Sequence, residues 1–389
     1  MADIPDHGIA RGLTNYGDRA FALYLRRSFI KSMGYSTELL ERPVVGIASS
    51  GSGFNNCHRA MPELVEAVKR GVLAAGGLPI EFPTISLGEV FLNPTSLMFR
   101  NLMSMDVEEM VRAQPMDSVV LIGGCDKTVP AQLMGAAAAD VPAIQLVTGP
   151  MMTGRHEGER LGACTDCRRF WGSYRAGKIE RKTIDLVEGR LATTAGTCAV
   201  MGTASTMACI AETLGMSLPG TAAIPAVHAD RLRAAEASGA HAVRLIQNPI
   251  RPSQVITTKS VHNALRVLLA LGGSTNAIIH LTAIAGRRGI PISLALVFME
   301  LGQQIGLNIK GVSFPNHFMV RLSLPQGEVI LDPLTGTSLS KEELQQMLDP
   351  YLDAQGYRGE YQLPLSAFLR SSSSREILSR FLRNLKAIY

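Results

Sequence analysis

Three cysteines in segments rich in Gly or Asn are the residues of this sequence with the clearest potential for chemistry. Cys125 stands in GGCDKTVP (123–130), where a thiol, a carboxylate and an amine are adjacent and directly follow an apolar run. A thiolate binds soft iron and a carboxylate binds hard Mg²⁺, so neighbouring positions of this segment could serve two different metals. The alternative is a solvated loop with one buried cysteine.

Two further cysteines lie in loops of similar composition. Cys57 belongs to NNCH (55–58), and Cys198 belongs to GTCAVMGTASTM (196–207), whose small residues permit a close approach of the backbone. A structural zinc site more often shows clustered cysteine pairs, so three dispersed thiols fit a cluster pocket assembled by the fold. Tight helix packing is the alternative at Cys198. His58 adjoins Cys57, and a hydrogen-bonded structural histidine is more common there than a pocket residue.

The close cysteine pair of the sequence gives a weaker signal. Cys164 and Cys167 form CTDC, which resembles half of a zinc site or a redox pair, but no second pair or suitable histidine couple follows. Six cysteines in 389 residues are also too sparse for a disulfide scaffold. We therefore interpret this pair as incidental.

Alternating sequence patterns predict the elements that position these residues. Apolar runs at 42–49, 78–87 and 117–124 alternate with helical patterns at 61–77, 95–113 and 131–139, and further helical patterns follow at 185–215, 229–239 and 261–270. Such alternation is typical of an α/β fold, in which helices cover a parallel sheet and ligands gather beyond the carboxyl ends of the strands. Cys57 and Cys125 both fall in loops after predicted strands.

Composition and charge narrow the class of protein. With 46% hydrophobic and 18% charged residues the sequence is globular, and its length suggests two or three domains. The net charge of +5 is spread along the chain, which does not indicate nucleic-acid binding and suits a small anionic substrate. The N-terminal segment has no apolar core of signal-peptide length, and no apolar stretch approaches the roughly 20 residues of a membrane helix. We expect a cytoplasmic protein without a membrane partner.

The character of the sequence changes near residues 287–291. A helical pattern at 293–306 is followed by short strand candidates at 318–323 and 328–331, which are separated by turns. We therefore predict two domains, 1–288 and 289–389, of which the second is a small α+β fragment.

The sequence from about residue 6 to residue 288 resembles the dehydratase family that includes dihydroxy-acid dehydratase, phosphogluconate dehydratase and the sugar-acid dehydratases. Six ordered segments carry the resemblance: NNCH (55–58), SLGEVFLNPTS (86–96), GGCDKTVPAQLMGAA (123–137), GTCAVMGTASTMA (196–208), GMSLPG (215–220) and LGGSTNAIIHL (271–281). The resemblance implies a homo-oligomer.

The resemblance also implies a set of site residues. Cys57, Cys125 and Cys198 would ligate an iron–sulfur cluster, [2Fe–2S] rather than [4Fe–4S]. Glu89, Asp126 and Lys127 would build a magnesium site, with Lys127 also a catalytic residue. The family carbamylates this lysine, and a carbamate offers hard oxygens to Mg²⁺ where an ammonium would repel it. The implied reaction removes water from a 2,3-dihydroxy carboxylic acid and gives a 2-keto-3-deoxy acid.

The resemblance leaves the substrate and the activity open. Residues 86–110 resemble the branch of the family that acts on sugar acids, so we expect an aldonate dehydratase. The alternative is the dihydroxy-acid dehydratase of branched-chain amino-acid biosynthesis. Family members carry a β-rich domain that supplies a serine base, and we expect this sequence to lack it. A non-enzymatic fusion that acts as a scaffold or interaction protein is therefore an alternative of another class.

The sequence from 289 to 389 resembles part of a transglutaminase-like domain of the family of tetratricopeptide-repeat, invasion-regulator-like proteins. The resemblance lies in GIPISLALVF, GVSFPNHFMVRL and LDPLTG. Such domains use a Cys-His-Asp set, for which His317 and Asp332 are the candidates, but no cysteine follows Cys209. We therefore expect no acyl-transfer activity from this segment.

Overall fold

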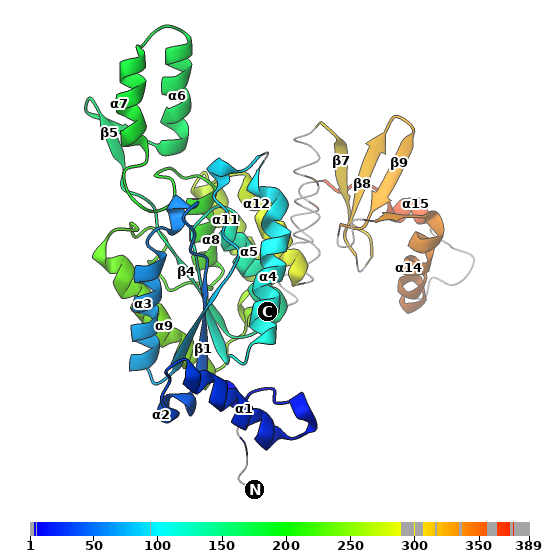
Figure 1. The fold of residues 1–389 in the computed structure, drawn as a ribbon. Coiled ribbons are helices and arrows are strands. Elements are labelled where there is room, and N and C mark those ends of the chain that lie inside the picture. Colours follow the sequence, from blue (N-terminus) through cyan, green and yellow to red (C-terminus); the bar gives the residue numbers. More distant parts are fainter. Residues whose placement is uncertain are drawn as a thin grey trace. The chain divides into compact units, whose positions relative to one another are not determined.

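Two four-stranded sheets of different type organise the described part of the chain, and each belongs to its own compact unit. The computed structural model describes residues 4, 6–93, 95–288, 299, 306–315, 317–333, 337–355, 364–373 and 376 (Figure 1). The first unit contains Met1–Ile256 and Asn263–His280, and the second contains Thr257–His262 and Leu281–Tyr389. The predicted helix at 293–306 lies almost entirely outside the described residues, and the division predicted after residue 288 stays a prediction.

Four parallel strands form the centre of the first unit, in the order β2–β1–β3–β4. Their bounds are β1 Val44–Ser49, β2 Leu78–Pro83, β3 Ser118–Gly123 and β4 Ala143–Val147. The three strands β1, β3 and β4 are buried along nearly their whole length, as their continuous apolar runs require when helices cover both faces. The predicted α/β fold class is confirmed, although the sequence patterns do not predict β4.

Helices cover both faces of this sheet (Figure 1). On one face α3 (Met61–Ala74) packs against α9 (Ala229–Gln247), and on the other α4 (Arg100–Ala113) packs against α5 (Thr128–Ala139). Side chains of α3 and α9 share one buried core with β1, β3 and β4. Because α9 comes from a distant part of the sequence, local patterns predict the helix but not the face that it covers.

Helices α3 and α9 approach each other closely at two glycines. A Cβ atom at Gly71 would lie 1.9 Å from the carbonyl oxygen of Glu236. A Cβ atom at Gly239 would lie 2.3 Å from the carbonyl oxygen of Val68. The absence of a side chain at both positions therefore allows α9 to close this face of the sheet.

The first unit contains further helices and strands. They are α1 Arg19–Ser32, α2 Thr37–Leu40, β5 Gly154–His156, β6 Glu159–Leu161, α6 Ala163–Arg175, α7 Arg181–Leu191, α8 Thr203–Thr213 and α10 Pro252–Val255. Of these, α6, α7 and β5 project away from the central sheet (Figure 1). Two more helices, α11 (Thr258–Ala270) and α12 (Asn276–Arg287), contribute residues to both units. Of the helices in the described ranges, none is both long and apolar enough to span a bilayer.

The prediction of helix across 185–215 is wrong for the residues between Leu191 and Thr203. Two helices, α7 and α8, are separated by a loop that carries Cys198. Gly196 in this loop has a φ of +120°, a conformation that side-chain-bearing residues rarely adopt. The small residues that suggest helix packing in the sequence instead allow a tight loop.

The second unit contains an antiparallel sheet in the order β10–β9–β8–β7. Its elements are β7 Asn308–Val312, β8 Met319–Leu324, β9 Gly327–Leu331, β10 Ser338–Leu339, α14 Lys341–Ala354 and α15 Leu365–Phe368. Leu344 and Leu348 of α14 share a buried core with Val312, Phe314 and Met319. Strands β8 and β9 and the α+β character of this fragment are confirmed.

The glycine contact between α3 and α9 gives a first prediction. Gly71→Ala should lower the free energy of unfolding by about 1–3 kcal/mol, because the added methyl group overlaps a helix backbone. Urea unfolding followed by far-ultraviolet circular dichroism measures the change. Gly189→Ala in α7 is the matched control, since nothing lies within 4 Å of its added Cβ. An equal loss of stability in both variants would contradict this account of the helix contact.

Candidate active site

The candidate site begins where the carboxyl ends of β1 and β3 lie side by side. The chain leaves β1 toward β2 on one side of the sheet and leaves β3 toward β4 on the other. Ligands of open α/β sheets bind at such a point, because the two loops diverge and leave a crevice. Cys57 follows β1 in the short helix η3 (Asn56–His58), and Cys125 directly follows β3.

Two of the predicted cysteines meet in this crevice. The thiols of Cys57 and Cys125 are buried and interact with each other. This interaction lowers the pKa of Cys125 and raises the pKa of Cys57, which burial and the charges of Cys125, Cys198 and Asp126 raise further. One thiolate is thus stabilised, whereas a second ionisation is opposed unless a cation binds both sulfur atoms.

The loop of the third predicted cysteine is fastened beside Cys57. Asn56 Nδ2 donates to the carbonyl oxygen of Gly196 at 3.3 Å, and the Gly196 amide donates to the carbonyl oxygen of Asn56 at 3.3 Å. A β-bridge between Pro150 and Thr197 holds the same loop from the other side. Three segments that are far apart in the sequence therefore bring their cysteine-bearing loops to one region.

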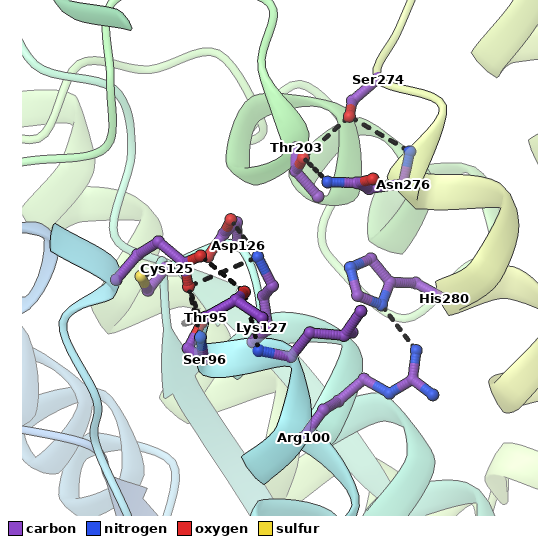
Figure 2. Close-up of polar contacts among 12 residues, drawn as sticks. Thr95, Ser96, Arg100, Cys125, Asp126, Lys127, Thr203, Ser274, Asn276 and His280 are labelled. Carbon is purple, nitrogen blue, oxygen red and sulfur yellow. Dashed lines mark hydrogen bonds and ion pairs between the residues drawn. The ribbon is translucent and has the colours of Figure 1, made fainter. Parts of the chain in front are cut away.

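The three predicted magnesium ligands also meet. Lys127 Nζ lies 2.7 Å from Asp126 Oδ2 and 3.4 Å from Glu89 Oε2, with the lysine side chain only 6% exposed. Figure 2 shows Lys127 and Asp126 beside Thr95 and Ser96. The Glu89 carboxylate accepts hydrogen bonds from Thr95 Oγ1 at 2.9 Å, from the Ser96 amide at 3.0 Å, and from the Ser96 hydroxyl.

The thiol pair and the lysine–carboxylate group are contiguous. Cys125 and Asp126 are neighbours in the chain, and the Cys125 Sγ atom lies 3.6 Å from Asp126 Oδ1. Lys127 precedes the first residue of α5, so the partial positive charge of this helix terminus favours the adjacent carboxylate of Asp126. The segment CDK thus carries soft and hard donor atoms at one point of the fold.

These donor atoms fit a two-iron cluster and Mg²⁺, provided that Lys127 is carbamylated. Within the described ranges, no three His, Cys, Asp or Glu side chains are close enough to hold one metal ion. The ammonium of Lys127 lies between the carboxylates of Asp126 and Glu89 and neutralises them, as a bound metal ion would. A carbamate on Lys127 would replace that charge with oxygens, which complete a donor set of the kind that Mg²⁺ prefers. A two-iron cluster distributes thiolates over two iron atoms, so its cysteines need not surround one ion.

His58 joins the two loops that carry Cys57 and Cys125. Its Nε2 atom accepts hydrogen bonds from the amides of Gly124 at 2.9 Å and Cys125 at 3.2 Å. Its Nδ1 atom therefore carries the hydrogen, and it lies 2.7 Å from the carbonyl oxygen of Ser50. Burial lowers the pKa of His58 to about 4. The interpretation of His58 as a hydrogen-bonded structural histidine is confirmed.

Sequence reasoning missed a second buried histidine at this site. His280, on α12, is 0% exposed, and Arg100 Nη1 at the start of α4 lies 2.9 Å from its Nδ1 atom (Figure 2). Burial, together with the positive charges of Arg100 and Lys127, lowers the pKa of His280 to about 3. The segment LGGSTNAIIHL contains this residue, but a lone histidine in an apolar helical pattern resembles a core residue.

A cluster of small polar side chains joins two helix termini near His280. Thr203 Oγ1 at the start of α8 lies 2.8 Å from Ser274 Oγ. Asn276 at the start of α12 donates from Nδ2 to Thr203 Oγ1 at 3.4 Å (Figure 2). These contacts connect α8, which follows the loop of Cys198, to the helix that carries His280.

In the second unit, the structure brings together the two residues that the transglutaminase-like resemblance singled out. His317 Nε2 and Asp332 Oδ1 are 3.1 Å apart. The sequence has no cysteine after Cys209, so this segment has no thiol of its own to pair with His317.

Two family profiles match the chain. The profile of the dihydroxy-acid/6-phosphogluconate dehydratase N-terminal family matches residues 42–310. The profile of the transglutaminase-like superfamily matches residues 273–383. Both resemblances inferred from sequence segments are therefore confirmed.

Curated relatives of the chain are dehydratases. The L-arabinonate dehydratase of Rhizobium leguminosarum is 44% identical over 280 residues, which are 72% of this chain and 48% of the relative. The 6-deoxy-6-sulfo-D-gluconate dehydratase of Pseudomonas putida is 43% identical over 277 residues, which are 71% of this chain and 47% of the relative. A dihydroxy-acid dehydratase of Ruminiclostridium cellulolyticum is 40% identical over 276 residues, which are 70% of this chain and 50% of the relative. The chain thus spans about half the length of these relatives.

The position of His58 gives a second prediction. His58→Phe keeps a ring of similar size but leaves two buried amides without an acceptor, which costs about 1–3 kcal/mol for each amide. The thermal unfolding midpoint should fall, as measured by differential scanning calorimetry. His241→Phe on α9 is the control, because His241 is only half-buried. Equal midpoints for His58→Phe and the control would show that His58 does not hold the two loops together.

Proposed function

The chain belongs to the dihydroxy-acid/6-phosphogluconate dehydratase family, and from this premise we propose that it is a hydro-lyase for a 2,3-dihydroxy carboxylic acid. The product of the proposed reaction is a 2-keto-3-deoxy acid. The observation that carries the proposal is the contiguous group formed by Cys57, Cys125, Asp126, Lys127 and Glu89, in which two thiols adjoin a buried lysine between two carboxylates.

The proposed cofactors are a [2Fe–2S] cluster and Mg²⁺. Cys57, Cys125 and Cys198 would hold the cluster, and Glu89, Asp126 and carbamylated Lys127 would hold Mg²⁺. When bound, the two groups supply Lewis-acid chemistry, which acidifies the hydrogen at C2 and activates the leaving hydroxyl at C3.

The residues of the chain prepare the site for this chemistry. Thr95 and Ser96 fix the Glu89 carboxylate through hydrogen bonds, so its oxygens keep one orientation toward Lys127. His58 fixes the backbone at Gly124 and Cys125, which sets the distance between the loops after β1 and β3. Burial of the lysine side chain keeps bulk water from its nitrogen, and this strengthens each electrostatic interaction in the site.

A sugar acid is the substrate class that we favour. The relatives named for L-arabinonate and 6-deoxy-6-sulfo-D-gluconate are 44% and 43% identical to the chain, whereas the dihydroxy-acid dehydratase is 40% identical. A dihydroxy acid of branched-chain amino-acid biosynthesis is the second candidate. We further propose a homo-oligomer in the cytoplasm that acts on a small anionic hydroxy acid.

The cluster is tested by iron and acid-labile sulfide analysis after anaerobic purification. The wild type should contain about two iron atoms per chain and absorb visible light. Cys125→Ser should lose most of this iron, because Cys125 is one of three proposed thiolate ligands. Cys209→Ser is the control, since Cys209 lies in α8 outside the proposed ligand set. A folded wild type without iron or sulfide would favour a scaffold or interaction protein over an enzyme.

The substrate class is tested by turnover. The cluster-loaded protein with Mg²⁺ should dehydrate L-arabinonate faster than 2,3-dihydroxyisovalerate, as measured by the release of the 2-keto acid. Lys127→Met should reduce turnover by about 100-fold or more, because it removes the proposed carbamate oxygens. Lys69→Met on α3 is the control, since Lys69 pairs with Glu66 and Glu81 at the surface. The reverse order of substrates would favour the dihydroxy-acid alternative.

A further inference from the structure

We infer that His280, held by Arg100, binds an oxygen atom of the substrate through a hydrogen bond donated by Nε2. This inference rests on the proposed function and assigns a further binding residue to the same site. The ligand chemistry is an oxygen acceptor of the hydroxy acid, either its carboxylate or a hydroxyl group.

The contact with Arg100 determines which nitrogen of His280 carries the hydrogen. A guanidinium has only donors, so the Arg100 Nη1 atom at 2.9 Å donates to Nδ1 of His280. Nδ1 therefore has no hydrogen of its own. A ring without a hydrogen on Nδ1 is neutral and carries its hydrogen on Nε2. His280 is thus an N–H donor in a fixed orientation.

This donor has no acceptor within the part of the chain that the structure describes. Nε2 of His280 is buried and makes no hydrogen bond there. A buried polar atom without a partner costs about 1–3 kcal/mol, and a hydrogen bond to a ligand or an ordered water removes this cost. Nε2 of His280 is thus a buried donor without an acceptor among the described residues.

The neighbours of Nε2 indicate what completes this hydrogen bond. In Figure 2 this nitrogen points toward Lys127 and Asp126, and the charge of Lys127 acts on the His280 ring. As an ammonium, Lys127 only donates, and its contacts go to Asp126 and Glu89, so it cannot accept from Nε2. In the proposed carbamylated state, the oxygens of Lys127 would be directed to Mg²⁺ together with those two carboxylates. In both states we infer that the partner of Nε2 is an acceptor from outside these residues. An oxygen of a hydroxy acid bound beside Lys127 has this property.

The binding test uses a sugar acid that cannot be dehydrated. A 3-deoxy aldonate keeps the carboxylate and the 2-hydroxyl but lacks the leaving group at C3, so calorimetric titration of the full cofactor-loaded chain reports binding without turnover. His280→Phe should raise its dissociation constant about 10-fold, since one hydrogen bond to the ligand is lost. His280→Gln, whose amide can donate, should restore part of the affinity. His241→Phe is the matched control and should bind as the wild type does.

A second probe separates the two oxygen sources. L-arabinitol has the hydroxyl groups of a sugar acid but no carboxylate. If His280→Phe weakens the 3-deoxy aldonate and leaves L-arabinitol unaffected, Nε2 donates to the carboxylate. If it weakens both by the same factor, Nε2 donates to a hydroxyl group. Equal affinities of His280→Phe and the wild type for both probes would overturn the inference, as would a wild type that binds neither.

Nitrogen NMR of the histidine side chains tests the same inference without a ligand. The wild type should show a neutral ring with its hydrogen on Nε2, assigned to His280 by comparison with His280→Gln. Arg100→Met should allow the other tautomer, because Nδ1 loses its donor. A wild-type ring with its hydrogen on Nδ1 would overturn the inference. The proposed function is judged separately, by cluster content and dehydration, so the two can fail independently.

Discussion

A buried lysine is the constraint on which the rest of the site depends. Lys127 has a side chain that is 6% exposed, and a buried ammonium is tolerated only when carboxylates neutralise it in a fixed geometry. Asp126 is adjacent in the chain, but Glu89 comes from the segment after β2 and is held by Thr95 and Ser96. The lysine therefore requires that the loops after two different strands meet, which the parallel sheet achieves at its carboxyl edge.

Two buried histidines use opposite tautomers for different tasks. His58 accepts two amide hydrogens at Nε2, so its hydrogen is on Nδ1 and its bonds remain within the protein. His280 accepts at Nδ1 from Arg100, so its hydrogen is on Nε2, where the described residues provide no acceptor. Both rings are kept neutral by burial. The partner that fixes one nitrogen thus decides whether a histidine fastens loops or presents a donor.

The sequence predicts the elements of this fold better than their contacts. Strands β1 and β3 and the loops that carry Cys57 and Cys125 follow from apolar runs that break at Gly or Asn, because these features are local. Local patterns cannot place Glu89 beside Lys127, and only the family resemblance joins them. Local patterns also miss β4 and the loop around Cys198, since a small-residue segment suits either a helix contact or a tight turn. His280 is missed because its role depends on Arg100, which lies on another helix.

The residues proposed to bind the cofactors all lie in one compact unit of the chain, so cofactor binding can be tested separately from turnover. Cys57, Cys125, Cys198, Glu89, Asp126 and Lys127 all belong to the first compact unit. That unit also contains His280 and Arg100, so the contacts described for the site all lie within the first unit. Dehydration further requires a base within hydrogen-bond reach of C2, and the chain spans about half the length of the relatives that it matches. Cluster content therefore tests the first unit by itself, whereas turnover also tests whether a base reaches the substrate.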